Sequence, residues 1–75
     1  MSSNPYQNEM AVRDRLMRAW ENSMELTRDF QMYSTQTPQG EISDTFREFA
    51  EDEAHHAAKL KSLIEQEKWK KSTKN

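Results

Sequence analysis

The stretch STQTPQG, residues 34–40, is where this chain of 75 residues is expected to turn. It contains the only glycine and one of the two prolines, and these residue types interrupt helices. Apolar side chains recur at helical spacing on both sides of it. The sequence therefore predicts an all-α chain, folded as an antiparallel hairpin of two helices in a single domain.

The first helix is predicted over about residues 5–34. Asn4 can serve as its N-cap, and Pro5 suits the first helical position, where its missing N–H costs nothing. Residues 1–4 precede the helix and are expected to form a flexible tail.

The turn is predicted over about residues 35–41, and two starts for the second helix remain open. Pro38 can open it in the same way as Pro5, or it can begin at Ser43. Ile42 is in phase with later apolar positions, which favours the earlier start and a helix over about residues 38–70. The basic, polar residues 71–75 are expected to be a second flexible tail.

Composition limits the kinds of protein that this chain can be. A domain of this size buries little surface, and without cysteine it needs self-association or a metal to be stable. The net charge is -2, with acidic and basic residues interleaved, which argues against a nucleic-acid partner. No stretch reaches the length of a membrane span, so we expect a soluble, cytoplasmic protein with no membrane partner.

The predicted second helix has a glutamate within its apolar stripe. At about 100° per residue, the stripe covers an arc of roughly 100°. Its members are Ile42, Phe46, Phe49, Ala50, Glu53, Ala57, Leu60 and Ile64. His56 lies at the edge of this stripe, whereas His55 points to the opposite, polar face. A buried carboxylate requires a cation, a proton or a hydrogen bond, so Glu53 is the first candidate for a functional residue.

Two interpretations of Glu53 and His56 remain open. Their i, i+3 spacing lets one helix offer a carboxylate oxygen and an imidazole nitrogen to the same metal ion. Alternatively they form a hydrogen-bonded pair, with Ser23 or Tyr33 as partner, that fixes the register of a metal-free bundle. Catalysis without a metal has little support, since the chain has neither a thiol nor a glycine-rich phosphate loop.

The segment AEDEAHHAAKL, residues 50–60, resembles the second helix of a rubrerythrin-type hairpin of the ferritin-like superfamily. Phe46 takes the aromatic position of that pattern, Glu53 and His56 take the ligand pair, and Ala57 and Leu60 follow. The resemblance covers about residues 16–66. It implies half of a four-helix bundle and a dinuclear centre of four glutamates and two histidines. Iron is the expected metal, with manganese or zinc as alternatives, because the ligands are oxygen and nitrogen.

The resemblance also implies a glutamate ligand from the first helix, and Glu21 is the candidate because it lies level with Glu53 in such a hairpin. By rotation Glu21 lies almost opposite the main apolar stripe of this helix. That stripe comprises Val12, Leu16, Ala19, Ser23, Leu26, Phe30 and Tyr33. A second stripe lies nearer to Glu21 and comprises Met10, Met17, Trp20 and Met24.

These two stripes make the first helix apolar over about half of its circumference, more than one neighbouring helix can cover. We therefore expect a homodimer that forms a ferritin-like four-helix bundle, or a higher homo-oligomer built from such dimers. The dimer would bring two copies of Glu53 and His56 towards a common axis.

Three classes of function remain open. The first is a ferritin-like protein that binds iron for storage, sequestration or chemistry with oxygen and peroxide; here a metal-dependent oxidoreductase is possible, but a non-enzymatic role is favoured. The second is a helical interaction module that binds another protein. The third is a degenerate ferritin-like relative that keeps the bundle without the metal.

Overall fold

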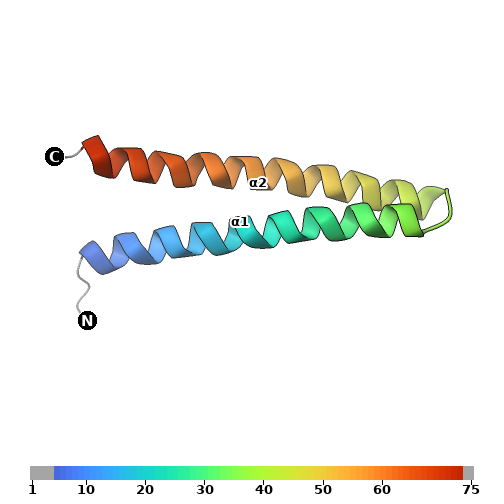
Figure 1. The fold of residues 1–75 in the computed structure, drawn as a ribbon, viewed down its shortest axis with the longest axis horizontal. Coiled ribbons are helices and arrows are strands. Elements are labelled where there is room, and N and C mark those ends of the chain that lie inside the picture. Colours follow the sequence, from blue (N-terminus) through green and yellow to red (C-terminus); the bar gives the residue numbers. More distant parts are fainter. Residues whose placement is uncertain (1–4, 74–75) are drawn as a thin grey trace.

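The computed structural model describes the backbone of residues 5–73 and the side chains of residues 11–67. Two long helices, α1 (Pro5–Gln36) and α2 (Glu41–Thr73), run antiparallel and are joined by a short turn (Figure 1). The hairpin is a flat body of 54 × 28 × 13 Å, one helix thick. No strand occurs in the described backbone, so the prediction of an all-α, two-helix hairpin is confirmed. None of its described helical segments is long and apolar enough to cross a membrane.

The helix α2 begins directly after Gly40 and at neither of the two predicted positions. The helix begins at Glu41, between the two predicted starts at Pro38 and Ser43. Gly40 has a φ of 155°, which side-chain-bearing residues rarely adopt, and its carbonyl oxygen accepts a 3.0 Å hydrogen bond from the Asp44 N–H. The acidic side chains of Glu41 and Asp44 lie in the first turn, where their negative charge interacts favourably with the positive end of the helix dipole.

Both helices extend further than predicted. α1 continues to Gln36, two residues beyond the expected end, and α2 continues to Thr73. Residues 71–73, expected in a flexible tail, are therefore helical. The rest of the expected tails, residues 1–4 and 74–75, lie outside the described residues.

Small side chains form the contact between the two helices. Ser43, Ala50 and Ala57 of α2 are each only 3% exposed, and Ser23 and Ser34 of α1 are also buried. The three α2 residues are seven positions apart, or about two helical turns, so they form one row that faces α1. Because this row is small, the helices approach closely, and the large apolar side chains lie to either side of it. Within residues 11–67 no large side chain is fully buried.

Two serines fix the register of the helices near the turn. The Ser34 hydroxyl donates to the Ser43 carbonyl oxygen at 2.9 Å, and the Ser43 hydroxyl donates to the Ser34 carbonyl oxygen at 2.8 Å. Both side chains are buried, so the pair satisfies its own polar groups. Glu53 lies ten residues after Ser43, and Met24 lies ten residues before Ser34. Because both helices rise by the same amount per residue, Glu53 is level with Met24.

Four rings define one flat side of the hairpin, which we call the aromatic face: Phe30 and Tyr33 of α1, and Phe46 and Phe49 of α2. Ring centroids lie 6.1 Å apart for Phe30 and Phe46, 5.6 Å for Phe30 and Phe49, and 5.5 Å for Tyr33 and Phe46. Tyr33 and Phe49 remain more than two-fifths exposed. The rings thus pack across the two helices and still present an apolar surface.

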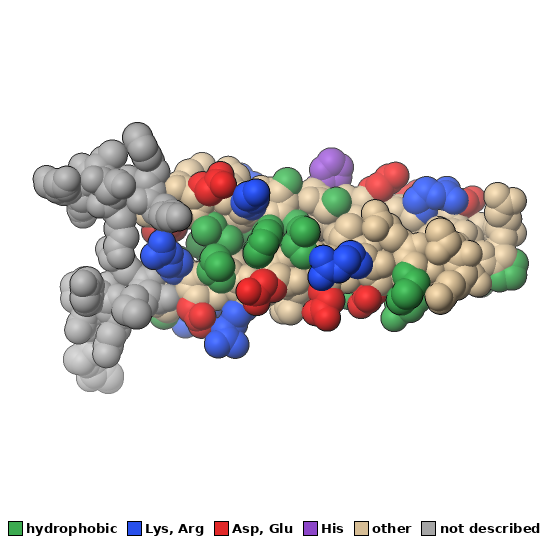
Figure 2. All heavy atoms as spheres, in the orientation of Figure 1, with side chains coloured by type: hydrophobic (Ala, Val, Ile, Leu, Met, Phe, Trp, Pro, Cys, Tyr) green, Lys and Arg blue, Asp and Glu red, His purple; other side chains and the backbone are tan. Residues whose placement is uncertain are grey.

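The opposite flat side has an open groove between the helices. Its lining comprises Met17, Trp20, Met24 and Thr27 of α1, and Ala54, Ala57, Ala58, Lys61, Ile64 and Glu65 of α2. Figure 2 shows hydrophobic side chains gathered over both helices in the half of the hairpin away from the turn, with acidic and basic side chains around them. The second apolar stripe of α1 therefore lines this groove, except for Met10, whose side chain lies outside the described residues.

Candidate metal site

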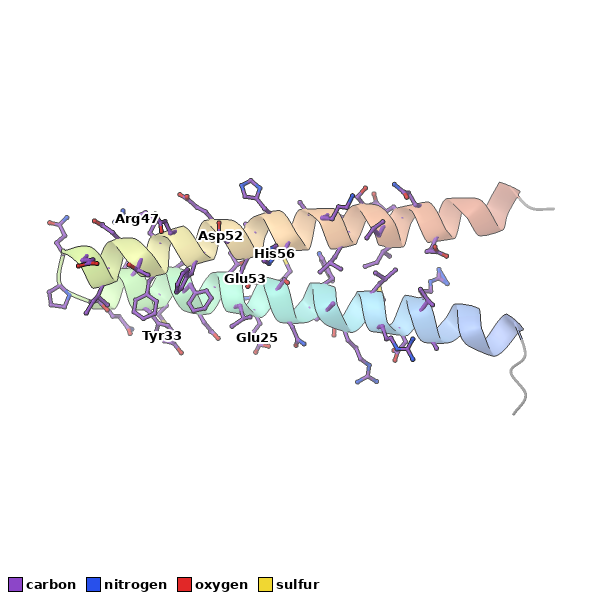
Figure 3. The ribbon with its side chains drawn as sticks, turned by 180° about the vertical axis from the view of Figure 1, so that it is seen from behind. Glu25, Tyr33, Arg47, Asp52, Glu53 and His56 are labelled. Carbon is purple, nitrogen blue, oxygen red and sulfur yellow. The ribbon has the colours of Figure 1, made fainter. Side chains whose placement is uncertain are left out.

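Glu53 and His56 lie on the same side of α2 as its two phenylalanine rings, Phe46 and Phe49. Glu53 follows Phe46 by seven residues and His56 follows Phe49 by seven, so each lies about two turns further along the same side of the helix. Both residues therefore belong to the aromatic face (Figure 3). The Glu53 side chain is 21% exposed and that of His56 is 63% exposed, so the carboxylate is the more deeply placed of the two.

The two side chains lie next to each other. Nδ1 of His56 is 3.5 Å from Oε1 of Glu53, longer than a strong hydrogen bond but within the range of an ion pair when the imidazole is protonated. A carboxylate oxygen and an imidazole nitrogen are thus presented together by one turn of α2. His55 is also exposed, but it lies on the other side of α2 by helical phase.

The partners that a metal-free interpretation would give to Glu53 make no hydrogen bond to it among the described side chains. Ser23 is buried in the contact between the helices, and Tyr33 packs against Phe46. Among the described side chains, neither makes a hydrogen bond to Glu53, and no lysine or arginine forms an ion pair with it. Among the described residues, the ionisable side chain found in contact with Glu53 is therefore His56, from its own helix.

The acidic residues of α1 at this level point away from the pair. Glu21 and Glu25 lie two residues before and after the buried Ser23 and are rotated from it by about 200° in opposite senses. Both are exposed, and Glu25 lies nearer to the aromatic face than Glu21. Figure 3 shows Glu25 at the outer edge of α1, while Glu53 and His56 lie on α2. The structure therefore does not bring Glu21 together with the other two predicted ligands. The described part of the chain contains no group of three or more His, Asp or Glu that could hold a metal ion.

Asn22 is an exposed polar residue of α1 near the level of the pair. It precedes Ser23 by one residue and is rotated from it by about 100°, towards the side that carries Leu26 and Tyr33. The serine register places it level with the turn of α2 that holds Glu53 and His56. Asn22 could have been found only with this register and with Ser23 as the centre of the contact, since no apolar pattern marks it.

One chain alone does not fit a metal ion. Zinc sites use at least three protein ligands, and structural sites use four, whereas the aromatic face supplies one carboxylate and one imidazole. The same face leaves Leu26 and Ile42 exposed as well as two of its rings, so it is a surface that a second chain can cover. Two chains would double the donor set.

A family model with the description Rubrerythrin matches residues 14–75, which include most of α1, all of α2 and both Glu53 and His56. No curated protein and no solved structure matches the chain.

Proposed function

The chain belongs to the rubrerythrin family, a family of the ferritin-like superfamily, and on this premise we propose that it is a homodimer that binds iron at a site between its subunits. Glu53 and His56 of each chain would hold the metal. Manganese and zinc are the alternatives, because carboxylate oxygen and imidazole nitrogen suit all three ions and no thiolate is present.

The observation that carries this proposal is the position of Glu53. Its side chain lies on an apolar face and is only 21% exposed even in a single chain. A second hairpin over the aromatic face would cover most of what remains. A carboxylate buried without a partner costs several kcal/mol, and α1 offers it neither a cation nor a hydrogen bond among the described side chains. A divalent ion shared between two copies of Glu53 supplies the missing positive charge.

The residues of the chain would have distinct tasks at such a site. Glu53 supplies charge neutralisation and an oxygen ligand, and the neutral imidazole of His56 supplies a nitrogen ligand. The rings of the aromatic face exclude water, which strengthens the interaction between carboxylate and cation. Bound iron would supply storage capacity or redox chemistry with oxygen or peroxide. We favour binding and sequestration, since the described residues of one chain contain no group of three or more His, Asp or Glu that could form a complete metal centre.

A metal-free bundle that binds another protein is the second candidate. The contact between His56 and Glu53, with 3.5 Å between Nδ1 and Oε1, favours it, because a protonated His56 can itself neutralise the carboxylate. The two candidates differ in whether the pair holds a proton or a metal ion.

Metal analysis of protein purified without chelator tests the proposal. Wild-type protein incubated with Fe²⁺ without oxygen, then desalted, is expected to retain iron as a dimer in native mass spectrometry. Glu53→Ala should abolish retention. Glu48→Ala removes an exposed carboxylate on the other side of α2 and should leave retention unchanged. A wild-type protein that retains no iron, manganese or zinc would establish the metal-free candidate in its place.

A further inference from the structure

The groove on the flat side opposite the aromatic face is open in a single chain, and its lining includes neither Glu53 nor His56. Its two hollows have volumes of about 260 and 350 Å³ and are lined mainly by apolar side chains (Figure 2). We infer that the groove is a second contact between copies of this chain. It joins dimers formed through the aromatic face into assemblies of four or more chains. This inference goes beyond the proposed function and does not depend on metal.

The two walls of the groove differ in size. The α1 wall carries Trp20 between two methionines, Met17 and Met24. The α2 wall consists at this level of three alanines, Ala54, Ala57 and Ala58. Trp20 lies fourteen residues before Ser34, and Ala57 lies fourteen residues after Ser43, so the indole and the alanines are level. The large side chains of one copy therefore fit over the small ones of another when α1 of each copy lies on α2 of the other.

A two-fold axis parallel to the helices produces this arrangement. It keeps both turns at the same end, preserves the levels of the residues, and makes every pair of neighbouring helices antiparallel. A two-fold axis across the helices would instead bring the two α1 walls together, with large side chains against large ones and alanines against alanines. The parallel axis is therefore the one that suits the walls of the groove.

Charged side chains beside the groove match in the same arrangement. Counted away from the turn, the groove side of α1 carries positive, negative and positive charges by helical phase, at Arg28, Glu21 and Arg13. The groove side of α2 carries negative, positive and negative charges in the same order, at Glu51, Lys61 and Glu65. Measured from the two register serines, the members of successive pairs differ by two, five and one residues, which is about 7.5 Å or less along the axis.

A single chain does not pair these six charges. None of them takes part in an ion pair within residues 11–67, where the ion pairs are Asp14–Arg18, Asp44–Arg47 and Glu53–His56. A second copy over the groove would bring an opposite charge near each of them, which selects this orientation over others. Because alanines form its α2 wall, the groove offers less apolar area than the aromatic face. Contact through it should therefore form at higher protein concentration.

Sedimentation velocity tests the inference in a concentration series that extends well above the micromolar range, with EDTA present so that metal plays no part. Wild-type protein is expected to pass from dimers to assemblies of four or more chains. Ala58→Glu places a charge in the groove at an exposed position and should stop at the dimer. Lys59→Glu changes the charge on the side of α2 that faces away from α1 and should assemble as wild type does.

Further variants separate the two contacts and test the orientation. Phe49→Glu, which weakens the aromatic contact, should still form dimers at the highest concentrations, whereas Phe49→Glu combined with Ala58→Glu should remain monomeric. Glu21→Lys and Lys61→Glu should each raise the dissociation constant of the groove contact by about 5-fold, because each reversal acts twice in a symmetric contact. The two reversals together should restore it.

Wild-type protein that never exceeds a dimer, and whose dimer survives Ala58→Glu, would overturn the inference and leave the groove to a different partner. Ala58→Glu that assembles like wild type, with unchanged helicity by circular dichroism, would overturn it as well. Charge reversals that do not compensate each other would contradict the two-fold arrangement. If Ala58→Glu alone abolished every dimer, the aromatic contact of the proposed function would be wrong while the groove contact stands.

Discussion

His56 lies one helical turn beyond Glu53 on the same side of α2, with its Nδ1 atom 3.5 Å from the Glu53 carboxylate. The adjacent His55 does not share this position, since one residue of helix rotates it by about 100° away from the aromatic face. The two neighbouring histidines are therefore chemically alike but structurally different, and each serves as a control for the other.

His56→Ala is expected to abolish metal retention, because it removes one of the two ligands that each chain supplies. His55→Ala should retain metal at close to the wild-type level. Retained metal per dimer, measured by mass spectrometry after desalting, distinguishes the variants. Equal losses in both would mean that the helical phase assigned to the aromatic face is wrong.

The aromatic face is also the expected contact between subunits. Phe49 is 44% exposed although its ring packs edge-on against Phe30, with 5.6 Å between centroids. Phe49→Glu would place a charge in that contact and should raise the dissociation constant of the dimer by about 10-fold or more. Sedimentation equilibrium at micromolar concentration measures this change.

Met32→Glu is the matched control for Phe49→Glu. Met32 is 45% exposed, as Phe49 is, but it lies on the side of α1 that faces away from α2 and should not take part in the dimer contact. A wild-type chain that sediments as a folded monomer would contradict the dimer itself.

The hairpin was predictable because Pro38 and Gly40 are concentrated between two long periodic segments. The centre of the helix contact was harder to predict. Hydrophobic periodicity gives most weight to large side chains, yet the buried row consists of Ser43, Ala50 and Ala57. Ile42, whose helical phase favours a start of the second helix at Pro38, is 64% exposed. It lies on the side of α2 that a second chain would cover, so the sequence pattern reflects more than the contacts within one chain.

The candidate site likewise has one part that the sequence predicts and one part that depends on how the two helices pack. Glu53 and His56 could be selected from sequence because their position relative to Phe46 and Phe49 depends only on local helical geometry. The absence of an α1 ligand could not be predicted from sequence, since the residue opposite Glu53 depends on the register between the helices. That register follows from the buried bonds of Ser34 and Ser43, which no sequence pattern specifies.

The close approach of the helices can be tested at Ala57, which is 3% exposed. Ala57→Leu would insert a branched side chain between the two backbones and should reduce the free energy of unfolding by about 1–3 kcal/mol. Ala58→Leu adds the same atoms at an exposed neighbouring position and should change it by less than about 0.5 kcal/mol. Urea denaturation followed by circular dichroism measures both. Similar values for the two variants would contradict the small-residue contact.

Gly40→Ala tests the backbone geometry at the start of α2. The φ of 155° at this position is unfavourable for any residue with a Cβ atom, although no other atom lies within 4 Å of where that atom would be. We therefore expect a loss of about 1 kcal/mol or more in unfolding free energy through backbone strain alone. Gln39→Ala, at the neighbouring exposed turn position, should have little effect. Urea denaturation followed by circular dichroism measures the unfolding free energy of both variants.

Glu53→Gln separates the two candidate functions through stability, because glutamine keeps the hydrogen-bonding capacity of the side chain but removes its charge. In the absence of metal, this variant should be as stable as wild type or more stable, since the dimer no longer buries two like charges. Added Zn²⁺ should raise the melting temperature of the wild-type protein, because the ion binds the folded dimer and not the unfolded chain. The same addition should leave Glu53→Gln unchanged. A wild-type melting temperature that does not respond to Zn²⁺, Fe²⁺ or Mn²⁺ would mean that His56 alone neutralises the carboxylate, and the chain would then be a metal-free member of its family.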